Sequence, residues 1–347
     1  MMPPLPVRVL LVEDSPLALM GLRRVLSKSP DIEIVGTAKN GKEALDLISS
    51  VNPAVVCTDL EMPIMNGLEL TKAIMTLCPL PILVVSSLGQ KERQDIISKL
   101  LEAGVIDVHP KPVAFDSRSA EELISKIKVV AGVVPLRRRQ QAGTLETKPE
   151  RQGSRGIRMV AIGASVGGPQ ALNTVLHSLP ASFPVPILCV QHIGAGFQRG
   201  LVTWLDGHCK LKIKTAEPGE YPVAGTAYFP REGTHLTVDT AGRLAASLDA
   251  AVKGHRPSVT VTFNSVASFY GSGAAGVLLT GMGEDGAEGL KTIADAGGLT
   301  IAQDEQSSVV FGMPRQAIEL GAARYILPVG RIAEMLMAEV SQKQEQL

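Results

Sequence analysis

The chain has 347 residues, which is enough for two domains that each bury a hydrophobic core. Its 34 basic and 34 acidic side chains give a formal net charge of zero, and no stretch expected to fold is strongly basic. Phosphate binding needs clustered Lys and Arg, and base stacking needs aromatic side chains, which make up only 3% of this chain. We therefore expect no nucleic-acid partner.

The cysteines and the N-terminal residues bear on the cellular compartment. Cys57, Cys78, Cys189 and Cys209 are scattered and form no C-x-x-C pair, so they fit buried thiols better than disulfides or zinc ligands. The start, Met1–Pro4, does not begin a signal peptide, and no apolar run reaches membrane-spanning length. The expectation is a cytoplasmic protein without membrane insertion.

Residues 7–128 alternate apolar, β-branched runs with amphipathic helical patterns. The predicted strands are Val7–Val12, Ile32–Ala38, Ala54–Thr58, Ile82–Ser86 and Val105–His109. The predicted helices include Leu17–Ser27, Gly41–Val51, Leu68–Cys78 and Glu92–Ala103. Apolar strands alternating with helices indicate a parallel sheet covered on both faces, here a doubly wound, flavodoxin-like α/β domain.

Polar residues follow four of these strands at their carboxyl ends. Glu13 and Asp14 follow the first strand, Asp59 follows the third, Ser86 ends the fourth, and Lys111 comes after the fifth. Because ligands of doubly wound sheets bind at this edge, these side chains should meet. Clustered carboxylates can hold Mg²⁺, and a lysine and a hydroxyl can contact a phosphoryl group. The pattern predicts a phosphoacceptor switch.

Residues 129–156 differ in composition from the segments on either side. Arg137-Arg138-Arg139 is followed by Gln, Gly, Thr, Glu, Lys and Pro with few apolar residues. This composition predicts an exposed linker. A basic docking strip for an acidic partner is an alternative compatible with a linker.

A second, mostly parallel α/β domain is predicted over residues 157–347. The predicted strands are Met159–Ile162, Val185–Gln191, Gly276–Thr280 and Leu299–Ala302. The predicted helices are Pro169–Leu179, Gly286–Ala296, Pro314–Leu320 and Arg331–Gln342. Residues 211–247 contain short alternating runs with turns at Pro218-Gly219 and Gly233-Thr234, so antiparallel hairpins are expected there.

A G-x-S-x-G pattern lies between the first strand and the first helix of this domain. Ser165 stands between Gly163 and Gly167, where a sharp turn can project a nucleophilic hydroxyl. The free N–H groups and the dipole of the following helix favour a developing oxyanion. The alternative is a turn that binds a phosphate or merely reverses the chain.

A nucleophilic serine needs a base and a group that orients the base. Among six histidines, His192 directly follows the strand Val185–Gln191 and so lies at the same sheet edge. Asp285 follows Gly276–Thr280 and precedes a helix, which also fits an N-capping role. The order Ser, His, Asp differs from the Ser, Asp, His order of α/β-hydrolases. These residues predict a triad of Ser165, His192 and Asp285.

Taken together, the motifs resemble those of the two-domain chemotaxis response regulator protein-glutamate methylesterases. The N-terminal part carries Val12-Glu13-Asp14-Ser15-Pro16, Thr58-Asp59-Leu60-Glu61-Met62-Pro63 and Lys111-Pro112. The C-terminal part carries Ile162–Pro169, Gln191-His192, His255-Arg256-Pro257-Ser258-Val259, Thr280–Gly286, Ala302-Gln303-Asp304-Glu305 and Gly312-Met313-Pro314. The C-terminal set is specific to this family, whereas many response regulators share the receiver motifs.

The resemblance implies an esterase that hydrolyses glutamate γ-methyl esters of chemoreceptors, releases methanol and also deamidates receptor glutamines. Ser165 would be the nucleophile, His192 the general acid and base, and Asp285 the residue that orients His192. The backbone N–H groups of Met282 and Val166 would stabilise the oxyanion. No cofactor is expected for the esterase chemistry.

For the receiver domain, residues 1–128, the resemblance implies Mg²⁺-dependent phosphorylation by a chemotaxis histidine kinase. Asp59 would accept the phosphoryl group, and Glu13, Asp14 and Asp59 would bind Mg²⁺. Ser86 and Lys111 would contact the phosphoryl oxygens. The unphosphorylated receiver would cover the esterase site, and phosphorylation would release it.

The sequence departs from the receiver pattern at three positions. Val108 stands where many receivers have an aromatic residue, Ser86 where Thr is common, and Asn66 where Asp is usual. Asn suits a turn as well as Asp does.

Two other functions fit a regulated two-domain chain. One is an adaptor whose second domain binds receptor tails without catalysis, but a binding module has no need of Ser165, His192 and Asp285. The other is a transcription factor, but the sequence shows no helix-turn-helix with a basic face.

Overall fold

The computed structural model describes residues 5–86, 92–112, 117–132 and 156–341. The chain divides into two compact units, residues 1–139 and 140–347. Helix α5 (Ser117–Ala131) passes the predicted boundary at residue 128, and most of the predicted linker, including Arg137-Arg138-Arg139, lies outside the described residues. Among the described residues, none of the helices combines the length and apolarity needed to cross a membrane.

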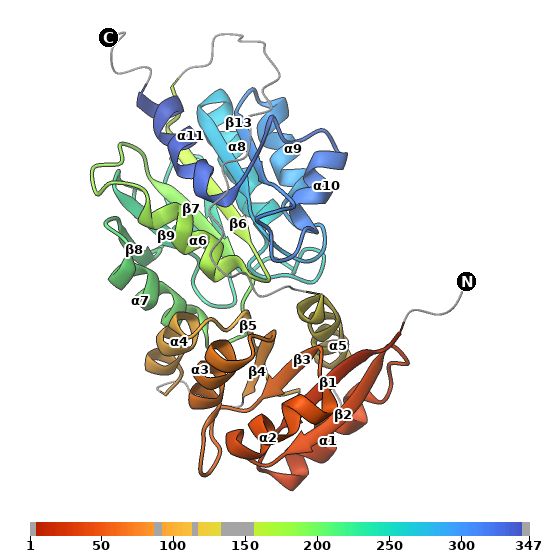
Figure 1. The fold of residues 1–347 in the computed structure, drawn as a ribbon. Helices are drawn as coiled ribbons and strands as arrows, with labels where there is room; N and C mark the ends of the chain where they lie inside the picture. Colours follow the sequence, from red (N-terminus) through yellow and green to blue (C-terminus); the bar gives the residue numbers. More distant parts are fainter. Residues whose placement is uncertain (1–4, 87–91, 113–116, 133–155, 342–347) are drawn as a thin grey trace. The chain divides into compact units, whose positions relative to one another are not determined.

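The N-terminal unit is a five-stranded parallel sheet in the order β2-β1-β3-β4-β5. Its strands are β1 (Val7–Val12), β2 (Ile32–Ala38), β3 (Val55–Thr58), β4 (Ile82–Ser86) and β5 (Asp107–Pro110). Its other helices are α1 (Pro16–Leu26), α2 (Gly41–Val51), α3 (Gly67–Leu77) and α4 (Glu92–Glu102). Helices α1 and α5 cover one face and α2, α3 and α4 the other (Figure 1), which confirms the predicted flavodoxin-like fold.

The C-terminal unit is built on a seven-stranded sheet in the order β14-β13-β12-β6-β7-β9-β8, and every neighbouring pair is parallel. Its strands are β6 (Met159–Ala164), β7 (Ile187–Gln191), β8 (Lys212–Thr215), β9 (Thr226–Phe229), β12 (Ala274–Leu278), β13 (Leu299–Gln303) and β14 (Tyr325–Leu327). A separate antiparallel pair consists of β10 (His235–Val238) and β11 (Leu244–Ser247). The predicted mostly parallel α/β domain is confirmed.

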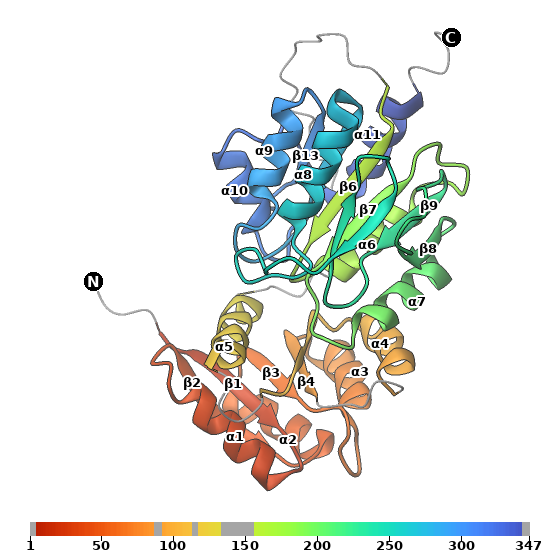
Figure 2. The same cartoon turned by 180° about the vertical axis from the view of Figure 1, so that it is seen from behind.

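Two helical layers cover this sheet. The helices are α6 (Gly168–His177), α7 (Gln198–His208), α8 (Val259–Tyr270), α9 (Ala287–Asp295), α10 (Met313–Glu319) and α11 (Val329–Ser341), with a short 3-10 helix, η1 (Gly271–Gly273), after α8. Helices α8, α9 and α10 pack together on one side, and α6, α7 and α11 on the other (Figure 2). Strand β6 lies in the middle and is fully buried, so the residues that follow it come from the centre of the sheet.

The prediction of antiparallel hairpins over residues 211–247 is only half right. Strands β10 and β11 form such a hairpin, but β8 and β9 pair in parallel and extend the main sheet. All four residues of β9 are buried, as expected for a strand inside a parallel sheet. The segment around Pro218-Gly219 is therefore a connection between two parallel strands and not a hairpin turn.

Candidate functional site

Ser165 lies directly beyond the carboxyl end of β6, in the turn that leads into α6. Its N–H donates to the carbonyl of Thr280 at 3.0 Å, and its own carbonyl accepts from the N–H of Gly168 at 2.8 Å. Gly167 in this turn has a φ of +75°, a conformation that favours glycine. The G-x-S-x-G pattern therefore forms the sharp strand-to-helix turn that was predicted.

The loop after β12 packs against this turn. A Cβ atom on Gly281 would lie 2.8 Å from Cβ of Ser165, closer than side chains approach one another. The hydroxyl of Thr280 donates to the carbonyl of Val166 at 3.0 Å. The predicted oxyanion donors, Val166 and Met282, thus lie on two segments that meet at Ser165.

The neighbouring strand β7 places His192 beside the serine turn. The His192 N–H donates to the carbonyl of Ala164 at 3.0 Å. The buried carboxamide of Gln191 donates through Nε2 to the carbonyls of both Ser165 and His192, at 2.7 and 2.8 Å. The backbones on which the two predicted catalytic side chains stand are therefore tied together.

His192 contacts Asp285 directly. Its Nε2 lies 2.9 Å from Oδ2 of the carboxylate, and the imidazole side chain is only 9% exposed. Its Nδ1 is buried and has no hydrogen-bond partner in the described residues, and no hydrogen bond joins the Ser165 hydroxyl to His192 in them. The ring nitrogen left to face a substrate or the serine is Nδ1.

The N-terminus of α8 holds the Asp285 carboxylate in place. Oδ1 accepts from the hydroxyl of Ser258 at 2.8 Å and from the N–H of Thr260 at 3.1 Å, and Oδ2 accepts from the N–H of Val259 at 2.7 Å. Burial alone would raise the pKa of Asp285, but its bond to His192 and those from Ser258 and Thr260 outweigh burial and hold the pKa well below its usual range. The carboxylate is therefore charged and fixed.

Asp285 does not cap α9, the helix that follows it in the chain, but accepts hydrogen bonds from the N-terminus of α8. Helix α9 begins after Gly286, which supplies no side-chain cap, whereas Asp285 accepts from the first turn of α8. Sequence reasoning missed α8 because its first residues, Val259–Thr262, are all β-branched. Its one available signal is Ser258, a favoured N-cap residue whose hydroxyl accepts from Val261 N–H at 3.4 Å.

His255 covers one face of the His192 ring. The two imidazoles stack with centroids 3.9 Å apart and planes 4° from parallel. His255 ends a tight turn closed by hydrogen bonds with Val252 in both directions, at 3.1 and 2.9 Å. The amine of Lys253 in that turn pairs with Glu284 at 2.9 Å, next to Asp285. The stack is thus held from the same loop that carries the carboxylate.

In the N-terminal unit, the predicted phosphoacceptor residues converge at the carboxyl edge of the sheet. The Lys111 amine lies 2.6 Å from Oδ2 of Asp59 and 2.7 Å from Oε2 of Glu13. Ser86 is buried at the end of β4, and its carbonyl accepts from the N–H of Lys111 at 3.2 Å. Oxygens of Glu13, Asp14 and Asp59 all lie within 4.8 Å of one another.

The charges in this cluster balance one another. Burial raises the pKa of Glu13, and the Asp59 carboxylate adds to the rise while Lys111 opposes it. Burial would lower the pKa of Lys111, but its bonds to Asp59 and Glu13 raise the pKa above the ordinary value. Three clustered carboxylate oxygens with one lysine beside them fit Mg²⁺, which prefers oxygen ligands.

Two of the departures from the receiver pattern have a structural outcome. Asn66 caps α3: its side chain accepts from the N–H of Glu69 at 3.0 Å, and Glu69 accepts from the N–H of Asn66 at 2.9 Å. This confirms that Asn serves the turn. Val108 is buried in β5, so a small aliphatic side chain fills the position at which many receivers have an aromatic residue.

Comparison with known proteins finds relatives for both units of the chain. Residues 160–336 match the model of the CheB methylesterase family, and residues 9–126 match that of the response regulator receiver domain. A protein-glutamate methylesterase/protein-glutamine glutaminase from Nitrosospira multiformis is 38% identical, with 98% of each chain covered. A relative of that name, numbered 4, from Myxococcus xanthus is 41% identical, with 95% of this chain and 96% of its own covered.

A solved structure agrees with the C-terminal fold. The crystal structure of the Thermotoga maritima CheB methylesterase catalytic domain is 37% identical, with a TM-score of 0.51. It covers 53% of this chain and 99% of its own. The chain therefore belongs to the CheB methylesterase family and carries a response regulator receiver domain in its N-terminal unit.

Proposed function

We propose that this chain is a phosphorylation-activated, cytoplasmic protein-glutamate methylesterase. Its substrates would be glutamate γ-methyl esters of methyl-accepting chemoreceptors, and it would also deamidate receptor glutamines. The observation that carries the proposal is the His192–Asp285 pair, joined at 2.9 Å beside the turn that holds Ser165. The names of the full-length relatives support this substrate class.

The first half of the reaction forms an acyl-enzyme. The Ser165 oxygen attacks the ester carbonyl carbon while its proton passes to Nδ1 of His192, and Asp285 stabilises the resulting imidazolium through Nε2. The backbone N–H groups of Met282 and Val166 stabilise the oxyanion. When the carbon–oxygen bond to the methoxy group breaks, His192 returns the proton and methanol leaves.

The second half of the reaction restores the serine. A water molecule gives a proton to His192 and attacks the acyl carbon, and the bond to Ser165 breaks as His192 protonates the serine oxygen. The product is a glutamate side chain. With a glutamine substrate the bond that breaks is carbon–nitrogen, and ammonia replaces methanol as the leaving group.

The receiver unit would control access to this chemistry. Asp59 would take a phosphoryl group from a chemotaxis histidine kinase, with Ser86 and Lys111 contacting the phosphoryl oxygens. Glu13, Asp14 and Asp59 would hold Mg²⁺, which would neutralise charge on the transferred group. The unphosphorylated receiver would block the esterase site, and phosphorylation would favour the open state. To shift the ratio of open to blocked molecules from 1:99 to 99:1, phosphorylation must stabilise the open state over the blocked one by about 5.5 kcal/mol.

Methanol release from membranes that carry methylated chemoreceptors tests this function. Wild-type protein should release methanol, and acetyl phosphate with Mg²⁺ should raise the rate. Asp59→Asn keeps the shape of the side chain but removes the acceptor, so it should keep the basal rate and lose the increase. A wild-type protein that releases no methanol under either condition would contradict the proposed function.

A further inference from the structure

Ser258 connects the Asp285 carboxylate to a second buried histidine. Its hydroxyl donates to Oδ1 of Asp285 at 2.8 Å, and its backbone N–H donates to Nδ1 of His235 at 3.1 Å. Both Ser258 and His235 have no exposed surface. The hydrogen bonds therefore continue from His192 through Asp285 and Ser258 to His235.

The hydrogen bonds of His235 define its tautomer. Because Nδ1 accepts from Ser258 N–H, it carries no proton, and Nε2 carries one that it donates to the carbonyl of Ala250 at 3.2 Å. Both ring nitrogens are satisfied in a neutral imidazole. If Nδ1 carried a proton, its N–H and the N–H of Ser258 would face each other with no acceptor between them.

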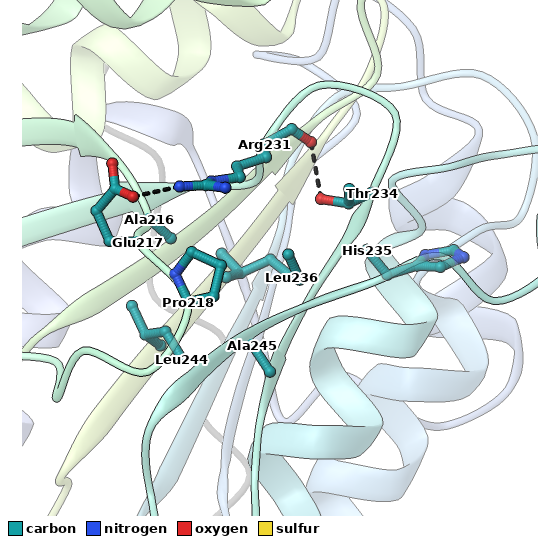
Figure 3. A pocket seen from close by; sticks show the side chains of 10 residues that line it. Ala216, Glu217, Pro218, Arg231, Thr234, His235, Leu236, Leu244 and Ala245 are labelled. Atoms are coloured by element: carbon teal, nitrogen blue, oxygen red, sulfur yellow. Dashed lines mark hydrogen bonds and ion pairs between the residues drawn. The ribbon is translucent and has the colours of Figure 1, made fainter.

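His235 belongs to a sheet separate from the one that carries the catalytic residues. It is the first residue of β10, in the hairpin β10–β11, whereas the catalytic residues follow β6, β7 and β12. Figure 3 shows a pocket that His235 lines together with Arg231, Pro218 and Leu244. The imidazole of His235 points away from the other three side chains. The ring turns to the N-terminus of α8 instead, where it meets Ser258.

We infer that His235 is a positioning residue for the proposed esterase reaction. It fixes the Ser258 backbone, and with it the hydroxyl and the first turn of α8 that hold Asp285. This inference rests on the proposed function, because it assigns His235 to the same reaction. Packing alone does not require an acceptor at Nδ1, whereas positioning does.

Two substitutions separate these roles. In His235→Asn the side-chain oxygen occupies roughly the place of Nδ1 and can still accept from Ser258 N–H. In His235→Gln the terminal amide reaches the place of Nε2 instead, so the acceptor toward Ser258 is lost. The matched control is Ser265→Ala, because the Ser265 hydroxyl joins α8 to the same hairpin by accepting from the N–H of Val238 at 3.2 Å and contacts neither Ser258 nor Asp285.

The measurement is kcat and KM for methanol release, with the melting temperature of each variant. His235→Gln should lower kcat by about tenfold or more with little change in KM, as losses of orienting partners usually do. His235→Asn should stay within about threefold of wild type, which is about 0.7 kcal/mol in barrier. Ser265→Ala should lower the melting temperature without changing kcat.

Equal losses of kcat in His235→Asn and His235→Gln, or a loss in Ser265→Ala as large as that in His235→Gln, would overturn the inference. If His235→Gln does not fold, His235→Leu makes the same comparison with His235→Asn, because leucine is close to asparagine in shape but has no acceptor for the Ser258 N–H. Equal kcat values for these two would then overturn it. Wild-type protein without esterase activity would refute the proposed function itself, and the positioning role with it.

Discussion

Nε2 of His192 and Oδ2 of Asp285 lie 2.9 Å apart, although 93 positions separate the two residues in the chain. The same carboxylate accepts three further hydrogen bonds from Ser258, Val259 and Thr260. Asp285 is thus held by one helix terminus and presented to the imidazole. This arrangement fixes Nε2 as the ring nitrogen that faces the carboxylate and leaves Nδ1, the atom that takes the serine proton in the proposed reaction, away from it.

Asp285 should stabilise the C-terminal unit in a pH-dependent way. Its pKa lies below the ordinary 3.8, despite burial, because of its bond to His192 and those from Ser258 and Thr260. A carboxyl group whose pKa is lowered by folding stabilises the fold at pH values above its unfolded-state pKa. This contribution to stability is lost as the pH falls through the folded-state pKa. Wild type should therefore exceed Asp285→Asn in unfolding free energy by a constant amount above about pH 5, and the difference should narrow below about pH 4.

Urea unfolding followed by tryptophan fluorescence measures this difference. The single tryptophan, Trp204, is buried in α7, so its emission reports on the unfolding of the C-terminal unit. A difference that widens as the pH falls would show that the charged form of Asp285 is not the stabilising one.

The His255 ring should keep the His192 imidazole in its plane. Aromatic pairs contribute about 0.5–1.5 kcal/mol beyond burial, which corresponds to roughly 2- to 13-fold in rate if the stack orients the base. His255→Ala should lower kcat by about tenfold, whereas His255→Phe, which preserves a flat ring, should stay within about threefold. Steady-state methanol release gives both values, and a Phe variant as slow as the Ala variant would rule out orientation by stacking.

Gly281 should be needed for the position of Ser165. A methyl group there would lie 2.8 Å from Cβ of Ser165, so Gly281→Ala must displace the serine turn or the loop after β12. We expect a loss of about 1–3 kcal/mol in stability together with reduced kcat. Gly207→Ala is the control: a Cβ atom at that position in α7 meets nothing within 4 Å, so the helix should gain up to about 1 kcal/mol. Undiminished kcat in Gly281→Ala would contradict the close packing.

Much of the fold, and the convergence of the predicted site residues, could be predicted because both follow from one rule. Buried runs such as Val7–Val12 and Met159–Ala164 are strands of parallel sheets, and the residues that follow such strands share one edge. His192 and Asp285 come together for this reason, because each lies beyond the carboxyl end of a strand of the same sheet. The same rule predicted the approach of Lys111 to Asp59.

The contacts that support the site could not be predicted in the same way. Ser258 and His235 lie 27 and 23 positions from their respective partners, Asp285 and Ser258, in segments whose β-branched and alternating residues do not reveal α8 or the place of the hairpin. The sequence next to Asp285 shows only α9, so the helix that it does cap, α8, could not be identified from local pattern. Tertiary packing decided these contacts.

The role of Ser165 gives the most direct test of the proposed chemistry. Methanol release from methylated receptor membranes should be measured for wild type and Ser165→Ala after acetyl phosphate and Mg²⁺ are added, with tryptophan fluorescence confirming that both proteins are folded. We predict that Ser165→Ala loses at least about a thousandfold in rate, because alanine has no hydroxyl with which to form the acyl-enzyme. A folded Ser165→Ala protein that works within about tenfold of wild type would contradict the assignment of Ser165 as the nucleophile.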